Sequence, residues 1–588
     1  MALAVTTRSY DNARTGANTQ ETVLTPALVG SNMLVKRFSL DVTDDPRIEA
    51  QPLFVSGVQL DGQAPRDIVY VCTMANNVWA FDADTGQAVW PAPVNLGPPL
   101  LQGPQLFDIN KLWGILSTPV VDLETNTIYI VCWTSHDGSQ ANAQFQLHAL
   151  DIVTGQPREQ PITIAADATA QGAPNSRFVP SHNKQRAALL LTTTRDPGGA
   201  EHKTLFAAFA VTNETDDPTS HGWIIAFDVD AFRQTAAWCT SSHGQGCGIW
   251  QGGAGIAQDE AGDLYVMTGN YGIEVPPPAG DLPESIVKLH YTPPPAANAP
   301  GGLDAVAWFT PFRDSDRNPN GDDDFQDYDL GSAGPLAIPG MGLVVGAGKD
   351  GVLYVLDQDS ALFGQGSNFA VLKQEPIFYT YFPGFGIDAS LVHNLDHLYD
   401  GKTHHLHGGS VFWQSPKHGP MLFCWGENEH LRAWTVDPSG TVTFFAKTAE
   451  TASAGAGGRG GMPGGMLALS SNGGQPNTGI IWALAPFSGD ANKFVVPGIL
   501  RAYDAENLDP VPNTDGTPRL KLLWDSTHIP GNNFDHCKFC PPVIANGQVF
   551  APTYDGRIDV YGLVGVAPGP IPTNARPTHL AKKLQKEP

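Results

Sequence analysis

The chain alternates short apolar runs with clusters of turn-forming residues along most of its length. Residues 68–90 show the pattern: Val, Ile and Tyr precede Asn76 and Asn77, a second apolar run follows, and the turn residues 84–86 lead to Trp90. β-Branched and aromatic residues favour a pleated strand, whereas Asn and Gly tolerate the positive φ of tight turns. No amphipathic helical period extends over about a dozen residues. The pattern predicts an all-β protein.

The same strand–turn unit recurs through the sequence. After the unit at residue 68, related units begin near residues 128, 205, 264, 343, 421, 480 and 549. Their spacing of roughly 55–80 residues suits four short strands with loops, and such units close most simply into one ring. We therefore expect an eight-bladed β-propeller with four-stranded blades over residues 35–563.

The two ends of the chain differ from the repeating units. An early apolar run at residues 35–40 should complete the last blade, which removes the open sheet edges. Residues 1–34 are then an N-terminal extension packing on the propeller. Residues 564–588 are rich in Pro and Lys and should form a loose tail.

A sequence motif marks the repeats. It reads Ala-x-Asp-x-x-Thr-Gly-x-x-x-Trp at residues 80–90. A Trp after such a turn buries a large apolar area, so we expect Trp90 to pack between neighbouring blades and to have no part in catalysis.

Charge and hydropathy narrow the range of partners. The formal net charge is -25, and a polyanion repels phosphate backbones, which makes nucleic acid an unfavourable partner. No apolar run approaches the ~18 residues of a membrane span. Residues 1–5 are too short for a signal peptide, so we expect a cytoplasmic protein, or a periplasmic or secreted one if a leader was removed. The expected partner is a small-molecule substrate, and no pattern indicates an oligomeric state.

Two close cysteine pairs leave three alternatives open. Cys239 and Cys247 flank a Gly/Ser/His loop, and Cys537 and Cys540 form a Cys-x-x-Cys. The two pairs could make one zinc site, could form local disulfides, or could remain free thiols. The other three cysteines lie in apolar strand runs and are expected in the core: Cys72, Cys132 and Cys424.

The repeat resembles the tryptophan-docking motif of quinoproteins, and residues 10–30 resemble the opening of quinoprotein alcohol dehydrogenases. This resemblance implies an eight-bladed propeller that holds pyrroloquinoline quinone (PQQ) near its axis. A calcium or lanthanide ion would bridge the quinone and protein carboxylates. The implied function is a PQQ- and metal-dependent oxidoreductase acting on an alcohol or aldehyde.

Five candidate site residues follow from the resemblance. Glu49 opens a Glu-x-x-Pro-Leu whose Glu contacts the quinone, and Asn270 of Thr-Gly-Asn resembles a metal ligand. Asp327 of Asp-Tyr-Asp resembles the general base, and Asp329 resembles the additional metal ligand of lanthanide-using members. Lys349 resembles the basic residue that hydrogen-bonds the quinone oxygens. A base for the hydroxyl proton and oxygen ligands for a hard cation suit such chemistry.

Three weaker matches complete the implied site, and the chain also departs from the family. Glu214 lies roughly where a metal-ligand Glu is expected, Lys111 replaces an Arg that binds a PQQ carboxylate, and Trp250 lies near the stacking Trp but out of register. The chain has no adjacent cysteine pair to cover the quinone. A propeller without cofactor that serves as a binding or scaffold module therefore remains an alternative.

A histidine-rich segment offers a third alternative. Five histidines lie within fifteen residues: His393, His397, His404, His405 and His407. The i, i+2 spacing of His405 and His407 places both rings on one face of an extended segment. Neutral imidazoles suit Zn, Cu or Fe, so His404, His405 and His407 form a candidate transition-metal site. The histidines could instead bond backbone groups in a polar loop, and the funnel could also hold a cofactor-free active site.

Overall fold

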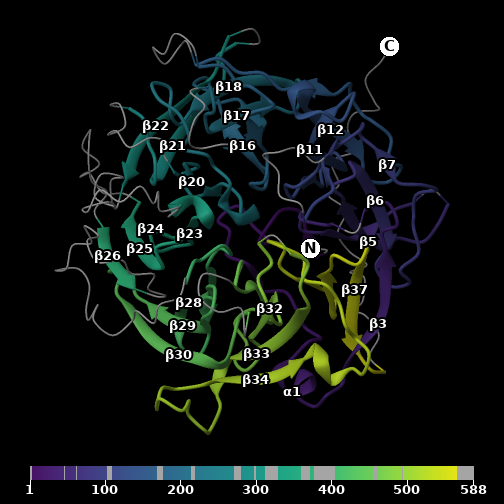
Figure 1. Ribbon diagram of the computed structural model, residues 1–588, viewed down its shortest axis with the longest axis vertical. Coiled ribbons are helices and arrows are strands. Elements are labelled where there is room, and N and C mark those ends of the chain that lie inside the picture. The colour runs from purple at the N-terminus through teal and green to yellow at the C-terminus, as the bar shows by residue number, and fades with distance from the viewer. Residues whose placement is uncertain are drawn as a thin grey trace, which may run out of the picture.

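Eight β-sheets surround a common axis in a computed structural model of the chain (Figure 1). The structure describes residues 3–45, 47–60, 62–101, 109–168, 176–212, 219–270, 280–296, 299–310, 329–358, 371–376, 404–453, 461–492 and 494–565. Five of the eight sheets have four strands, and three have a fifth. The expected all-β, eight-bladed β-propeller is confirmed, with blades that are mostly four-stranded.

The first four blades follow one another along the chain, and each gives its strands in hydrogen-bonded order. Blade 1 contains β1 (Ala4–Val5), β4 (Leu53–Val58), β5 (Arg66–Cys72), β6 (Asn77–Asp82) and β7 (Val94–Asn95). Blade 2 contains β10 (Val120–Asp122), β11 (Thr127–Ser135), β12 (Ala143–Asp151) and β13 (Ile162–Thr163). Blade 3 contains β14 (Asn183–Lys184), β16 (Glu201–Val211), β17 (Trp223–Asp228) and β18 (Arg233–Cys239), with β15 (Leu190–Arg195) also on β16. Blade 4 contains β19 (Ala257–Gln258), β20 (Leu264–Met267), β21 (Ile286–Thr292) and β22 (Gly302–Phe309).

The remaining blades complete the ring. Blade 5 contains β23 (Leu336–Ile338), β24 (Leu343–Ala347), β25 (Val352–Asp357) and β26 (Val371–Pro376). Blade 6 contains β27 (Val411–Ser415), β28 (Gly419–Cys424), β29 (His430–Val436) and β30 (Val442–Thr451). Blade 7 contains β2 (Ala17–Asn18), β31 (Met466–Ser470), β32 (Ile480–Pro486), β33 (Gly498–Leu508) and β34 (Leu520–Asp525). Blade 8 contains β35 (Val543–Ala545), β36 (Gln548–Pro552), β37 (Arg557–Leu563) and β3 (Leu34–Asp41).

The remaining elements are short. A two-stranded ribbon joins β8 (Leu100–Leu101) to β9 (Leu112–Trp113). The helices in the described part of the chain are α1 (Pro26–Val29), η1 (Gln140–Asn142), η3 (Gln251–Gly253), η5 (Leu330–Ser332) and η7 (Ser526–His528). Among the described residues, no helix is long and apolar enough to cross a membrane.

The ring closes through the early strand that the sequence predicted. β3 pairs antiparallel with β37, with Leu40 opposite Ile558, and Figure 1 shows the purple β3 beside the yellow β37. Lys36 adds an ion pair of 2.7 Å to the buried Asp559. Because the outer strand of blade 8 comes from the start of the chain, the two ends of the propeller are held together.

The extension before β3 does more than cover the ring. Residues 3–18, here called the axial segment, run through its centre, where Figure 1 also places the N-terminus. Backbone carbonyls of this segment accept hydrogen bonds from Ser56, Val121, Gln258, Ala337, Phe412 and Leu469, which belong to or adjoin blades 1, 2, 4, 5, 6 and 7. Asn12 donates to Leu191 in blade 3, and Asn18 donates to Ile544 in blade 8. The axial segment therefore bonds to all eight blades.

Arg14 is the most highly bonded side chain of the axial segment. It is 3% exposed. Its Nε donates to the Ile256 carbonyl at 2.8 Å, and its Nη2 donates to the Leu189 carbonyl at 3.0 Å. Its Nη1 donates to Thr7 Oγ1 and to the Arg8 carbonyl, both at 2.8 Å. One guanidinium thus satisfies buried carbonyls of blades 3 and 4 and of the axial segment itself.

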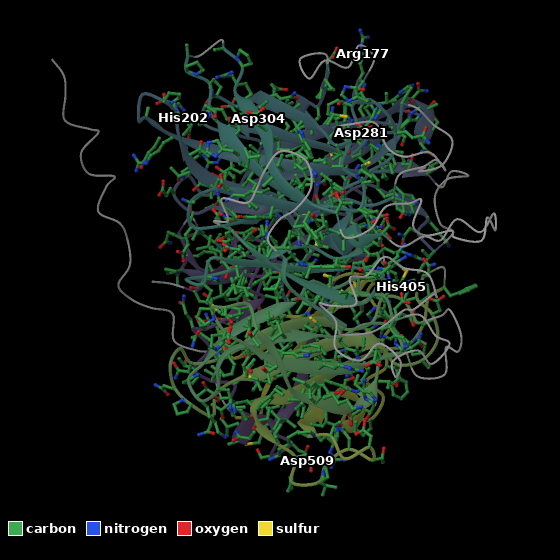
Figure 2. The ribbon with its side chains drawn as sticks, turned by 90° about the vertical axis from the view of Figure 1, so that its left-hand side faces the viewer. Arg177, His202, Asp281, Asp304, His405 and Asp509 are labelled. Atoms are coloured by element: carbon green, nitrogen blue, oxygen red, sulfur yellow. The ribbon has the colours of Figure 1, made fainter. Side chains whose placement is uncertain are left out.

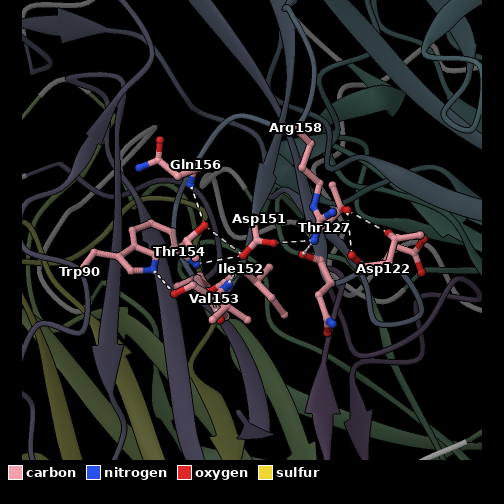
Figure 3. A network of polar contacts seen from close by, with 12 residues as sticks. Trp90, Asp122, Thr127, Asp151, Ile152, Val153, Thr154, Gln156 and Arg158 are labelled. Atoms are coloured by element: carbon pink, nitrogen blue, oxygen red, sulfur yellow. Dashed lines mark hydrogen bonds and ion pairs between the residues drawn. The ribbon is translucent and has the colours of Figure 1, made fainter. Parts of the chain in front are cut away.

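The predicted role of the repeat Trp is visible between blades 1 and 2 (Figure 3). Trp90 is 5% exposed, and its Nε1 donates to the Val153 carbonyl of the next blade at 3.1 Å. Asp151 accepts from the backbone N–H groups of Val153 and Thr154 and thereby shapes the turn. Gly155 has φ +72°, and a Cβ there would lie 3.0 Å from the Trp90 ring. The turn therefore requires glycine so that the indole can pack against it.

Replacing Arg14 by Met should destabilise the protein strongly. The substitution leaves several buried carbonyls without donors, and we expect the free energy of unfolding to fall by about 3–5 kcal/mol. Urea unfolding followed by circular dichroism measures the change. The exposed Arg37, which makes one hydrogen bond to the Leu563 carbonyl, is the matched control, and Arg37→Met should change stability by less than about 0.5 kcal/mol. Equal effects of the two substitutions would contradict the axial role of Arg14.

Candidate functional site

Glu49 lies just before β4 of blade 1 and is 1% exposed. Its carboxylate forms an ion pair with Arg186 and accepts hydrogen bonds from Tyr554 Oη at 2.7 Å and Asn110 Nδ2 at 3.1 Å. Burial alone raises the pKa of Glu49, but Arg186, Lys538 and the two hydrogen bonds outweigh it and lower that pKa below its ordinary value. Glu49 is therefore a buried, ionised and compensated carboxylate.

Phe539 connects this carboxylate to other blades. Arg186 lies over the Phe539 ring, with Cζ 4.8 Å from the centroid. The same ring lies 5.8 Å from Trp250 in an edge-on arrangement and 6.0 Å from His407. The Phe539 backbone has φ +64°, a conformation that residues other than glycine rarely adopt. This backbone conformation places an aromatic ring among residues that adjoin blades 3, 4 and 6.

Trp250 leads onward to a second ion pair. Lys349 Nζ lies 5.6 Å from the Trp250 ring centroid and 2.7 Å from Asp329 Oδ2. The Asn270 backbone N–H donates to Asp329 Oδ1 at 3.1 Å. A Cβ at residue 269 would lie 2.3 Å from that same oxygen, so Gly269 of the Thr-Gly-Asn motif makes room for the carboxylate. Trp250, Lys349, Asp329 and Asn270 thus form one continuous set of contacts.

We call the whole set the axial cluster. It consists of Glu49, Arg186, Phe539, Trp250, Lys349, Asp329 and Asn270, joined in that order by the contacts above. Five of its seven members are candidates from the sequence, and they come from separate regions of the chain. The structure brings those five together, whereas their roles at a cofactor or metal remain predictions.

The other sequence candidates have different positions. Asp327 and Glu214 lie outside the described residues, as do His393 and His397. Lys111 is exposed, and Arg186 is the cation that contacts Glu49. Arg186 was missed by sequence reasoning, although an arginine directly before the apolar run 187–191 was a usable signal.

Lys538 is a second cation that sequence reasoning missed. It is 3% exposed, and its Nζ donates to the Asn492 carbonyl at 2.9 Å. Burial lowers the pKa of Lys538 to about 7, with Arg186 and Lys184 acting in the same direction and Glu49 opposing them. This lysine can therefore change protonation state near neutral pH at the edge of the axial cluster.

The histidine segment also contacts the axial cluster. His407 lies 5.7 Å from the Trp250 ring. Its Nε2 is 2.8 Å from Glu427 Oε1, and His405 Nδ1 is 3.5 Å from Glu427 Oε2. The ligand atoms of His405, His407 and Glu427 lie within 4.8 Å of one another. His404 instead approaches Glu429 at 3.8 Å, so Glu427 takes the place that the sequence analysis gave to His404.

All seven cysteines are buried, and no two of them form a disulfide. Cys537 donates to the Ile48 carbonyl, and burial raises its pKa, as does the neighbouring Cys540. Among the described residues, no group of three or more metal-binding side chains includes a cysteine. The structure therefore places neither a disulfide nor a group of metal-binding side chains at Cys239, Cys247, Cys537 and Cys540.

The axial cluster can be compared with the needs of PQQ, a planar anionic quinone. Trp250 and Phe539 supply aromatic rings, and Lys349, Arg186 and Lys538 supply cationic donors around them. Asn110, which donates to Glu49 through Nδ2, also has a buried Oδ1 with no hydrogen-bond partner in the structure. Aromatic faces, cations and polar atoms with spare bonding capacity fit a flat polyanionic group.

The chain was also compared with family models, curated proteins and solved structures. No family model matches the sequence, and no curated protein matches it. In three dimensions, the chain is similar to a europium-containing methanol dehydrogenase, with 14% identity, 93% of this chain and 81% of that chain covered, and a TM-score of 0.46. It is also similar to the computationally designed Ika8 protein, with 11% identity, coverage of 90% and 99%, and a TM-score of 0.41. Similarity at this level does not bear on activity.

The perturbed Lys538 predicts a specific pH dependence of stability. Its pKa of about 7 in the folded protein lies below the ordinary 10.5, so the folded state binds fewer protons than the unfolded state between these values. Stability contributed by this site should therefore rise with pH through that window, by about 1 kcal/mol per pH unit above pH 7.5.

Urea unfolding of the wild type and Lys538→Met at pH 6.5, 7.5 and 8.5 measures this effect. The wild type should gain stability relative to Lys538→Met as the pH rises. The exposed Lys521 provides the matched control, and Lys521→Met should keep a constant difference from the wild type. A constant difference for Lys538→Met as well would show that Lys538 titrates normally.

Proposed function

We propose that the axial cluster binds PQQ together with a calcium or lanthanide ion, and that the protein oxidises a small alcohol or aldehyde. The observation that carries this proposal is the position of Lys349 between the Asp329 carboxylate and the Trp250 ring. A cation held between an aromatic face and a carboxylate can hydrogen-bond an anionic planar group on that face.

Five members of the axial cluster have a role in this proposal. Trp250 and Phe539 would hold the quinone ring, and Lys349 would donate to its oxygens. Asn270 and Asp329 offer oxygen ligands of the kind that a hard cation prefers, and the resemblance adds Glu214 and Asp327. PQQ, when bound, accepts the hydride equivalent from the substrate.

The proposal also needs a base that accepts the hydroxyl proton of the substrate. By the resemblance, Asp327 accepts the substrate hydroxyl proton, which requires an ionised carboxylate at that position. Asp329, two residues later, is held by Lys349 Nζ and the Asn270 N–H. These two bonds would fix the end of the Asp-Tyr-Asp segment and hence the position of the base.

A second candidate function has support from Glu49. Its carboxylate already bonds to Arg186, Tyr554 and Asn110, so this part of the cluster is charge-compensated without a ligand. A compensated cluster is compatible with a propeller that serves as a binding or scaffold module. Reconstitution separates the two functions, because the module would bind no quinone and transfer no electrons.

The test is oxidation of short alcohols and aldehydes with a dye as electron acceptor after incubation with PQQ and either Ca²⁺ or La³⁺. We expect activity that requires both additions. Lys349→Ala and Asp329→Asn should each lower kcat at least about 100-fold, because each removes a charged group that positions reacting atoms. Lys447→Gln, which breaks a surface ion pair with Asp515, should retain full activity.

Correct folding of the variants is checked by circular dichroism. Absence of PQQ binding and of dye reduction in the folded wild type would exclude the oxidoreductase and favour the binding module. Activity that survives both Lys349→Ala and Asp329→Asn would place the reaction elsewhere.

A further inference from the structure

His405, His407 and Glu427 form a side-chain group that the proposed quinone chemistry does not use. Both imidazoles approach the same carboxylate, one at each oxygen. His407 is 1% exposed and Glu427 is 3% exposed, whereas His405 is half-buried. Figure 2 views the ring edge-on. His405 and Asp281 lie toward one face of the ring, and His202 lies toward the opposite face.

The backbone holds these three residues in position. The Glu427 N–H donates to the His405 carbonyl at 2.9 Å, which links the carboxylate to the histidine segment. Between the two histidines, the Leu406 N–H donates to the Gly348 carbonyl at 3.1 Å, and its own carbonyl accepts from Ser332 Oγ at 2.7 Å. The His407 carbonyl lies so close to residue 252 that a Cβ there would be 2.0 Å away. The arrangement is therefore fixed by blades 4, 5 and 6 together.

We propose that His405, His407 and Glu427 bind a divalent first-row transition metal such as Zn²⁺. The ligand atoms already lie within 4.8 Å of one another, a spread that a central ion about 2.0–2.2 Å from each atom can draw together with small side-chain rotations. Two imidazoles and one carboxylate are the ligand types that select such metals. The carboxylate lies in a buried position where a cation offsets the cost of removing its charge from water.

The number of protein ligands in this metal site matches that of catalytic zinc sites. The described residues supply three ligands, and three protein ligands leave at least one coordination position for water or substrate, as in catalytic zinc sites. The Trp250 and Phe539 rings, 5.7 and 6.0 Å from the His407 ring, form its apolar wall. Trp250 also contacts Lys349, so the metal site and the axial cluster share one indole.

The two cation sites differ in ligand chemistry, which makes this proposal independent of the proposed function. Asn270 and Asp329 offer oxygen atoms, which suit Ca²⁺ or a lanthanide, whereas the histidine group suits a softer ion. Zn²⁺ and Co²⁺ therefore probe the histidine site in protein that contains no PQQ.

The experiment uses the full chain after treatment with a chelator and dialysis. Calorimetric titration with Zn²⁺ should give one ion per chain, and Co²⁺ should give visible absorption bands of a site with nitrogen ligands. His407→Gln, His405→Ala and Glu427→Gln should weaken Zn²⁺ binding by more than the roughly 10- to 100-fold that loss of a supporting partner causes. His404→Gln, the neighbouring control, should bind Zn²⁺ as the wild type does.

Folding does not confound this test, because His405 is the most exposed ligand and circular dichroism of His405→Ala checks the fold. Zn²⁺ should also raise the thermal midpoint of the wild type and of His404→Gln but not of His405→Ala. Absence of stoichiometric Zn²⁺ binding in the wild type would overturn the proposal. Unchanged binding in folded His405→Ala and Glu427→Gln would overturn it equally.

Discussion

The packing of the axial segment through the centre of the ring is the constraint on which the other features depend. A propeller of eight blades leaves inner strands whose backbone groups face one another across an axis. Here residues 3–18 bond to every blade, and the Arg14 guanidinium satisfies carbonyls of blades 3 and 4 as well as of the axial segment itself. Buried carbonyls must find donors, so the position of this segment and the spacing of the blades are determined together.

The candidate site depends on the same segment. Arg8 Nη2 donates to the Phe539 carbonyl at 3.0 Å, and this contact supports the residue whose ring joins Arg186, Trp250 and His407. The hydrogen bond from Arg8 to the Phe539 backbone therefore helps to hold the Phe539 ring in contact with its neighbours. The charges of the cluster are arranged in pairs, since Glu49 bonds to Arg186 and Asp329 to Lys349. Such pairing allows buried charges to remain ionised.

The sequence was sufficient for the fold because each blade repeats the same local pattern. The apolar runs, the turn glycines and Trp90 specify a blade without information from distant residues, and the run at residues 35–40 had no other sheet to complete. Several site residues also lay in short recognisable segments, as Glu49, Asn270 and Lys349 do. In the structure, Lys349 and Asn270 both bond to Asp329, and Glu49 is linked to them through Arg186, Phe539 and Trp250.

The missed residues owe their positions to contacts that no local pattern records. Arg8 and Phe539 are 531 residues apart, and Phe539 stands between two cysteines that drew attention to zinc or disulfides instead. Arg186 reaches Glu49 across 137 residues. Glu427 follows a strand of blade 6 with no spacing that relates it to His405 or His407. Their common position near the axis follows from ring closure.

The central claim is that Trp250, Asn270, Asp329 and Lys349 surround a quinone and a hard cation. X-ray diffraction from crystals grown with PQQ and La³⁺, recorded near a lanthanum absorption edge, tests it most directly. The account predicts one strong anomalous peak within about 2.3–2.6 Å of oxygen atoms of Asn270 and Asp329, with quinone density against Trp250. An anomalous map with no peak at Asn270 and Asp329, or with its peak elsewhere in the ring, would contradict the account.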